Sequence, residues 1–143
     1  MILDANILIR AVLGSRVPVL LRKYAATVEL AAPDTAFAEA RGKLPGILLR
    51  RRDMIPTASA LATLDALAKL VLPIEFETYG KLEMPARQRI ERRDENDWPV
   101  LATALALDRP IWTEDLDFFG CGWRPYFLGA LSGLASSPKV MFV

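Results

Sequence analysis

The chain opens with Met1-Ile2-Leu3-Asp4-Ala5-Asn6-Ile7-Leu8, in which a short apolar run stops at an acid and a second apolar run follows. Ile2-Leu3 predicts the end of a short buried strand that delivers Asp4. Residues Ala5 to Leu13 are expected to form a helix that ends at Gly14, because glycine commonly terminates helices. A strand followed directly by a helix is typical of an α/β fold.

Strands and helices are expected to alternate through the rest of the chain. Short apolar runs predict strands, and apolar residues at helical spacing, such as Leu61, Leu64 and Leu67, predict helices. This alternation favours an α/β sandwich around a mainly parallel sheet. The further strands are expected at residues 28–32, 72–76 and 110–113. The further helices are expected at 18–27, 57–70 and 100–107, with an exposed helix or loop at 83–93. One more helix is expected to begin at a cap, Asp34 or Thr35, and to be interrupted at Pro45-Gly46.

The length of 143 residues suits a single domain over residues 1–143. The tail after Gly122 carries no motif, and we expect it to complete the sheet and to add a helix around Leu128 to Leu134. No run approaches the roughly 20 apolar residues of a membrane span, and the first residues do not resemble a signal peptide. A single cysteine, Cys121, is compatible with a reducing compartment, so a cytoplasmic protein without a membrane partner is expected.

Histidine is absent from the whole chain. Its absence excludes Ser-His-Asp and Cys-His catalysis, and with one cysteine it also excludes the usual His/Cys zinc sites. An enzyme with this composition must work with carboxylates, hydroxyls, amines or a bound ion. Oxygen ligands favour magnesium or manganese over zinc.

Acidic residues occur in four separate places that suit such an ion: Asp4, Glu39, Asp97 and Asp115. Asp4 and Asp115 each follow a short apolar run, and ligands of parallel sheets sit beyond the carboxyl ends of the strands. Hydrolysis of a phosphodiester by two metal ions needs several converging carboxylates. The spacing along the chain therefore permits a metal-dependent hydrolase.

Each acid also has a purely structural interpretation. Asp4 suits a helix cap, and Glu39 could form a surface ion pair with Lys43, four residues on. Asp94 and Asp97 precede a helix, where the helix dipole favours negative charge. Asp115 lies close to Asp117, and aspartate is common in turns, so a turn alone would explain both residues.

The order of the motifs resembles that of PIN domains, including VapC-like toxin ribonucleases. Asp4-Ala5-Asn6-Ile7-Leu8 is similar to the opening of the family, and Arg93-Asp94-Glu95-Asn96-Asp97-Trp98-Pro99-Val100 is similar to the start of its helix with the third acid. Pro110-Ile111-Trp112-Thr113-Glu114-Asp115-Leu116-Asp117-Phe118-Phe119 is similar to its strand that ends in Thr and an acid. The resemblance runs from Met1 to about Gly122 and implies a three-layer α/β/α sandwich with a central, mainly parallel sheet.

The resemblance also implies roles for individual residues. Asp4, Asp97 and Asp115 match metal-binding acids, and Glu39 matches the helical glutamate by its place after the second strand. The resemblance further implies that catalysis depends on Mg²⁺ or Mn²⁺. The supporting positions are Asn6 and Thr113, which would orient the carboxylates, and Asp94, which would be an additional acid.

Three functions remain open at this stage. The first is a metal-dependent endoribonuclease that cuts RNA, the toxin of a toxin–antitoxin pair, with an antitoxin partner and a homodimeric assembly. The second is phosphoryl transfer through an aspartyl phosphate at Asp4, but Asn6-Ile7-Leu8 lacks the second catalytic motif it requires. The third is a catalytically silent PIN-like module that binds RNA or a protein.

Arginines and tryptophans offer weaker signals. Arg50-Arg51-Arg52 could hold a phosphate backbone or form a solvated face, and the same two interpretations apply to Arg87, Arg89, Arg92 and Arg93. Trp112 is expected in the core because its strand is apolar, whereas Trp98, beside a proposed ligand, could pack or stack on a base.

Overall fold

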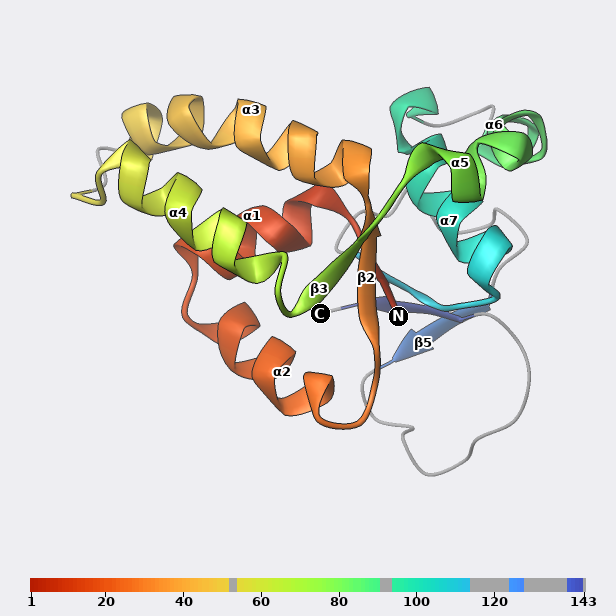
Figure 1. Cartoon of the computed structure of the whole chain (residues 1–143), viewed down its shortest axis with the longest axis horizontal. Coiled ribbons are helices and arrows are strands. Elements are labelled where there is room, and N and C mark those ends of the chain that lie inside the picture. The colour runs from red at the N-terminus through yellow and green to blue at the C-terminus, as the bar shows by residue number, and fades with distance from the viewer. Residues whose placement is uncertain (52–53, 91–93, 114–123, 128–138, 143) are drawn as a thin grey trace.

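A computed structural model describes residues 1–51, 54–90, 94–113, 124–127 and 139–142 of the chain. These residues form a parallel sheet whose six strands have the order β3-β2-β1-β4-β6-β5 (Figure 1). The central position of β1 places Asp4 between the ends of β2 and β4. The strands are β1 (Ile2–Leu3), β2 (Leu30–Pro33), β3 (Val71–Ile74), β4 (Ile111–Thr113), β5 (Arg124–Phe127) and β6 (Lys139–Phe142).

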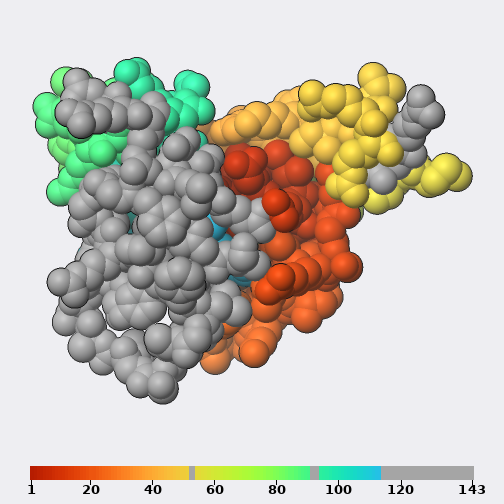
Figure 2. All heavy atoms as spheres, turned by 180° about the vertical axis from the view of Figure 1, so that it is seen from behind, coloured from red at the N-terminus to blue at the C-terminus, as the bar shows by residue number. Residues whose placement is uncertain are grey.

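Helices connect the strands and cover both faces of the sheet (Figure 1). In Figure 2, which shows the opposite face, the end of α3 (yellow) and the region of α6 (green) extend to opposite sides of the molecule. The α-helices are α1 (Ala5–Leu13), α2 (Arg16–Ala25), α3 (Asp34–Arg51), α4 (Thr57–Leu67), α5 (Phe76–Tyr79), α6 (Glu83–Ile90) and α7 (Trp98–Leu107), with the short 3₁₀ helices η1 (Gly80–Leu82) and η2 (Glu95–Asp97).

Side chains of successive strand residues enter two separate cores. Leu3 and Trp112 pack with residues of α1, α2 and α3, whereas their neighbours Ile2 and Ile111 pack with residues of α6 and α7. This alternation follows from the period of two residues in a strand. The described residues therefore form the expected three-layer α/β/α sandwich around a central parallel sheet.

Several elements confirm the sequence-based expectations closely. The strand at Ile2-Leu3 and the helix over Ala5–Leu13 have the expected bounds, and the backbone N–H of Gly14 donates to the Arg10 carbonyl at 2.8 Å. The tail completes the sheet with β5 and β6. The helix expected around Leu128 to Leu134 lies outside the described residues.

The expected interruption at Pro45-Gly46 is wrong, because α3 runs through both residues to Arg51. Proline removes one hydrogen bond from a helix and disfavours its continuation. Leu44 and Leu48, one turn apart on either side of this point, are both buried in the structure. Their burial stabilises the helix across the proline, since tertiary packing commonly outweighs local propensity.

Other element bounds differ by a few residues. The second helix begins at Arg16 rather than Pro18, and β2 spans Leu30–Pro33 rather than residues 28–32. Residues 83–90 form the helix α6, with Ala86 and Ile90 buried against α7. None of the described helices is both long and apolar enough to cross a membrane.

Candidate active site at the carboxyl ends of the strands

A small pocket of about 50 Å³ opens at the carboxyl ends of β1 and β2. It has room for an ion or a few water molecules rather than for a nucleotide. Three of the four predicted acids line it together, although they come from three separate parts of the chain. The lining residues are Asp4, Ala5, Asn6, Thr35, Ala36, Glu39, Asn96, Asp97, Pro99 and Val100.

Asp4 is the most buried of these acids, with 4% of its surface exposed. One carboxylate oxygen accepts a hydrogen bond of 2.8 Å from the backbone N–H of Ile7, which makes Asp4 the N-cap of α1. The other oxygen accepts a hydrogen bond from the hydroxyl of Thr113 at the end of β4. The predicted helix cap therefore exists, and it fixes the carboxylate at the pocket at the same time.

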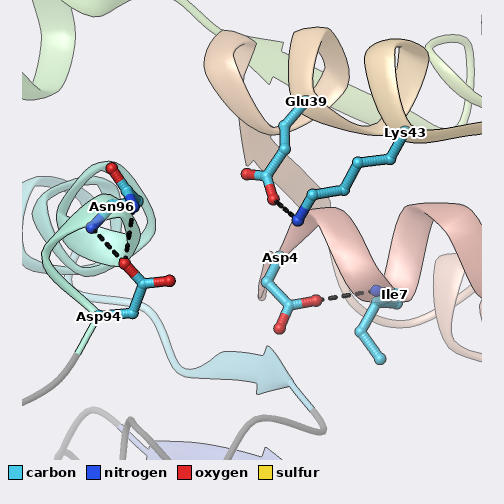
Figure 3. Close-up of polar contacts among 6 residues, drawn as sticks. All are labelled: Asp4, Ile7, Glu39, Lys43, Asp94 and Asn96. Atoms are coloured by element: carbon cyan, nitrogen blue, oxygen red, sulfur yellow. Dashed lines mark hydrogen bonds and ion pairs between the residues drawn. The ribbon is translucent and has the colours of Figure 1, made fainter.

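Glu39 lies in the second turn of α3 and forms the ion pair that its spacing from Lys43 predicts. The Lys43 Nζ lies 2.5 Å from Oε1 of Glu39 (Figure 3). This hydrogen bond raises the pKa of Lys43, and the charges of Asp97 and Asp94 act in the same direction. The structural interpretation of Glu39 and its place in the pocket are therefore compatible.

Asp97 ends η2 and stands directly before α7, where it lines the pocket beside Asn96. Asp94 is the N-cap of the same 3₁₀ helix, and its Oδ1 accepts hydrogen bonds from the backbone N–H of Asn96 at 2.9 Å and from the Asn96 side-chain amide at 2.8 Å. Figure 3 shows the Asp4 carboxylate beside Ile7, the Glu39 carboxylate beside Lys43 and the Asp94 carboxylate beside Asn96. Asp94 caps a turn and does not line the pocket itself.

A layer of buried groups holds the surrounding elements in place. The Tyr79 hydroxyl in α5 donates to Oδ1 of Asp34 at 2.5 Å, which ties α5 to the first residue of α3. Burial, together with this hydrogen bond, raises the pKa of Tyr79 to about 12. Trp98 packs against Tyr79 with ring centroids 5.8 Å apart, and the Arg87 guanidinium lies 5.2 Å from the centroid of the Trp98 ring. Trp98 is therefore a packed residue, with 9% of its surface exposed.

The structure brings together Asp4, Asn6, Glu39 and Asp97 among the predicted site residues, and Thr113 reaches the site through Asp4. Asp115 lies outside the described residues. Asn96 and Thr35 also line the pocket, although neither is a predicted site residue and Thr35 is expected only as a helix cap. Thr35 could have been found because it lies two residues beyond the carboxyl end of β2, much as Asn6 lies three residues beyond that of β1.

The side-chain oxygens of the pocket lining belong to carboxylates, amides and the Thr35 hydroxyl, and such oxygen ligands suit Mg²⁺ or Mn²⁺. Within the described residues, no three acidic, histidine or cysteine side chains lie close enough together to hold an ion by themselves. Asp4 and Asp97 fit such a cation in their chemistry, and Asp115 was predicted as the third acid.

Comparisons with known proteins agree with this architecture. A search of curated proteins finds no match. Among solved structures, the chain is similar to one described as VapBC2 from Rickettsia felis bound to a DNA fragment from their promoter, with 18% identity, a TM-score of 0.57 and coverage of 80% of this chain and 86% of that chain. That likeness shows the shared fold. The family model described as PIN domain matches residues 2–126, and the chain therefore belongs to the PIN domain family.

Proposed function

We propose that this protein is a metal-dependent endoribonuclease that acts as the toxin of a toxin–antitoxin pair. The observation that carries the proposal is the meeting of Asp4, Glu39 and Asp97 in one pocket at the carboxyl ends of parallel strands. Like charges in one pocket are costly unless a cation balances them. The family adds support, because its members typically cut RNA with magnesium or manganese.

Asp4, Asp97 and Asp115 are the residues proposed to hold Mg²⁺ or Mn²⁺. When bound, such an ion lowers the pKa of an attacking water and stabilises the leaving oxygen. Thr113 would keep the Asp4 carboxylate directed toward the pocket through its hydrogen bond. Glu39 would position the water, and Asn6 would orient a neighbouring carboxylate. Since the chain has no histidine, we infer that water protonates the leaving oxygen.

Cleavage of RNA by the purified protein tests the proposal. Incubation with structured and unstructured RNAs should give defined fragments with Mn²⁺ and none with EDTA, and Asp4→Asn should abolish cleavage. Asp108→Asn is the matched control. Asp108 follows α7 near the amino end of β4, whereas the pocket lies at the carboxyl ends of the strands. Its backbone is left-handed, a conformation that asparagine also adopts. Cleavage that persists in Asp4→Asn would point to a contaminant and refute the assignment. RNA binding without cleavage at any metal concentration would favour the silent module.

The antitoxin is a separate part of the proposal. The similar solved structure is described as VapBC2 with a DNA fragment from their promoter, which supports a protein partner here by analogy. Expression of the unmodified chain should arrest bacterial growth, and Asp4→Asn should not. Co-expression of a small neighbouring gene should relieve the arrest. Growth that continues with the soluble unmodified chain would contradict the toxin role.

We also infer that the protein forms a homodimer. A groove near the end of α3 is lined by apolar side chains, among which Leu49 is 81% exposed and Met54 is 98% exposed. Contiguous apolar surface of this kind commonly marks an interaction site. Light scattering should give twice the mass of the chain, and Met54→Asp should lower that mass. A monomer at all concentrations would refute the inference.

A further inference from the structure

Lys43 stands at the rim of the acidic pocket. It lies on α3 one turn beyond Glu39, and its side chain extends back along the helix so that the ammonium meets the Glu39 carboxylate at 2.5 Å (Figure 3). Glu39 lines the pocket, and the Lys43 side chain is 53% exposed. A solvent-exposed positive charge therefore lies beside one of the acids that line the pocket.

Two other described cations, Arg41 and Arg87, form ion pairs with residues that do not line the pocket. Arg41, two residues before Lys43, forms an ion pair with Asp65 on α4. Arg87 pairs with Glu83 on its own helix and lies over the ring of Trp98. Lys43, by contrast, pairs with Glu39, which lines the pocket.

RNA must bring a negatively charged backbone to a pocket lined by Asp4, Glu39 and Asp97. The repulsion has to be offset where the phosphate arrives, and a lysine ammonium is a compact charge with three donors on a flexible stem. One of these donors goes to Glu39. The exposure of the side chain leaves the ammonium accessible to a second acceptor that approaches from solvent.

We propose that Lys43 is a substrate-positioning residue, whose ammonium bridges the Glu39 carboxylate and a phosphate oxygen of the bound RNA strand. This inference rests on the proposed nuclease function. It differs from a structural role, in which the ion pair would only hold the Glu39 side chain in place. The two roles predict different effects of removing the charge.

Binding of a fluorescent single-stranded RNA in EDTA tests the inference without cleavage. A lysine on a phosphate contributes about 0.7 to the slope of log affinity against log salt for a single strand. Lys43→Ala should reduce the slope by about this amount and weaken binding about 5- to 10-fold at low salt. Lys43→Arg should keep most of the salt slope and most of the RNA affinity. The matched control is Lys69→Ala, beyond the end of α4 and before β3, which should leave the slope unchanged.

Steady-state cleavage with Mn²⁺ separates the two roles further. If Lys43 holds RNA, Lys43→Ala should raise KM about as much as it weakens binding and should largely preserve kcat. A lower kcat with an unchanged KM and an unchanged salt slope would assign Lys43 to Glu39 alone and overturn the inference.

Failure of the inference is distinguishable from failure of the proposed function. RNA cleavage by the unmodified chain, with the same salt slope in Lys43→Ala and Lys69→Ala, would overturn the inference and leave the nuclease intact. A slope reduced only in Lys43→Ala, in a protein that cuts no RNA, would support the inference and refute the nuclease. No measurable RNA binding by the unmodified chain would overturn both.

Discussion

The hydroxyl of Thr113 donates a hydrogen bond to the carboxylate of Asp4 across more than a hundred residues of sequence. The two residues are brought together because β4 pairs with β1, with Leu3 opposite Trp112, so the next residue of each strand reaches the same edge of the sheet. Both side chains are buried. The sheet register itself therefore sets the orientation of the most buried acid in the pocket.

Replacement of Thr113 by valine tests this orientation. Valine keeps the shape but removes the donor, so an oxygen of Asp4 loses a hydrogen bond, which costs about 1–3 kcal/mol at a buried site. A less constrained Asp4 should lower Mn²⁺ affinity about 10- to 100-fold, as is typical of partners that orient metal ligands. Thr113→Ser should preserve both the stability of the protein and its affinity for Mn²⁺. Calorimetric titration with Mn²⁺ measures the affinity, and equal affinity in Thr113→Val and the unmodified chain would contradict the role.

Asp4 should show separate effects on stability and activity. Its carboxylate caps α1, and asparagine also accepts the hydrogen bond from Ile7, whereas alanine does not. Asp4→Ala should therefore be less stable than Asp4→Asn by about 1 kcal/mol in urea denaturation with EDTA. Both variants should lack RNA cleavage. Equal stability of the two variants would show that the cap contributes little.

The site was predictable where a short apolar run leads directly into an acid. Asp4 was singled out on that basis, and the structure places it in the pocket at the carboxyl ends of the central strands, while its role in a site stays a prediction. Glu39 was harder to assign, because its spacing from Lys43 also predicts the ion pair that the structure contains. Local spacing cannot tell whether a helix face meets solvent or a pocket, since the neighbouring strands and helices decide this.

Contacts between distant segments were not predictable from local patterns. The hydrogen bond of Tyr79 to Asp34 depends on how α5 meets α3, and neither residue carries a motif. The continuation of α3 through Pro45 depends on the burial of Leu44 and Leu48 beneath it. In both cases tertiary packing, rather than propensity, determines the outcome.

Tyr79 should make stability depend on pH in the alkaline range. Its pKa is about 12 in the folded chain, above the value of about 10 for an unfolded tyrosine, because of burial and of its hydrogen bond to Asp34. The folded state thus favours the protonated hydroxyl. Its contribution is fully present below about pH 10 and is lost as the pH rises toward about 12.

Tyr79→Phe removes this titration along with the hydrogen bond. At neutral pH the substitution should cost about 1–2 kcal/mol of unfolding free energy, since the ring remains and one partly buried hydrogen bond is lost. The difference in unfolding free energy between the two proteins should shrink between about pH 9 and about pH 11. Urea denaturation of both proteins at these two pH values measures the difference in unfolding free energy. A difference that stays constant would show that Tyr79 ionises alike in the folded and unfolded chains.

Gly80 should tolerate a side chain poorly because of Phe76. A Cβ at Gly80 would lie 2.6 Å from the Phe76 ring, which packs at an edge-to-face angle against Tyr79 and Trp98. Phe76 is 48% exposed, so its ring can swing into solvent at the loss of these contacts. Gly80→Ala should therefore destabilise the protein by about 1 kcal/mol in thermal or urea denaturation.

Two further variants make the Gly80 prediction specific. Gly42 lies on α3 with no atom within 4 Å of an added Cβ, so Gly42→Ala should stabilise the chain by about 0.5–1 kcal/mol through helix propensity. In a Phe76→Ala background the obstructing ring is gone, and Gly80→Ala should then cost nothing. If Gly80→Ala destabilises equally with and without the Phe76 ring, the cause lies in the backbone of η1 and not in this contact.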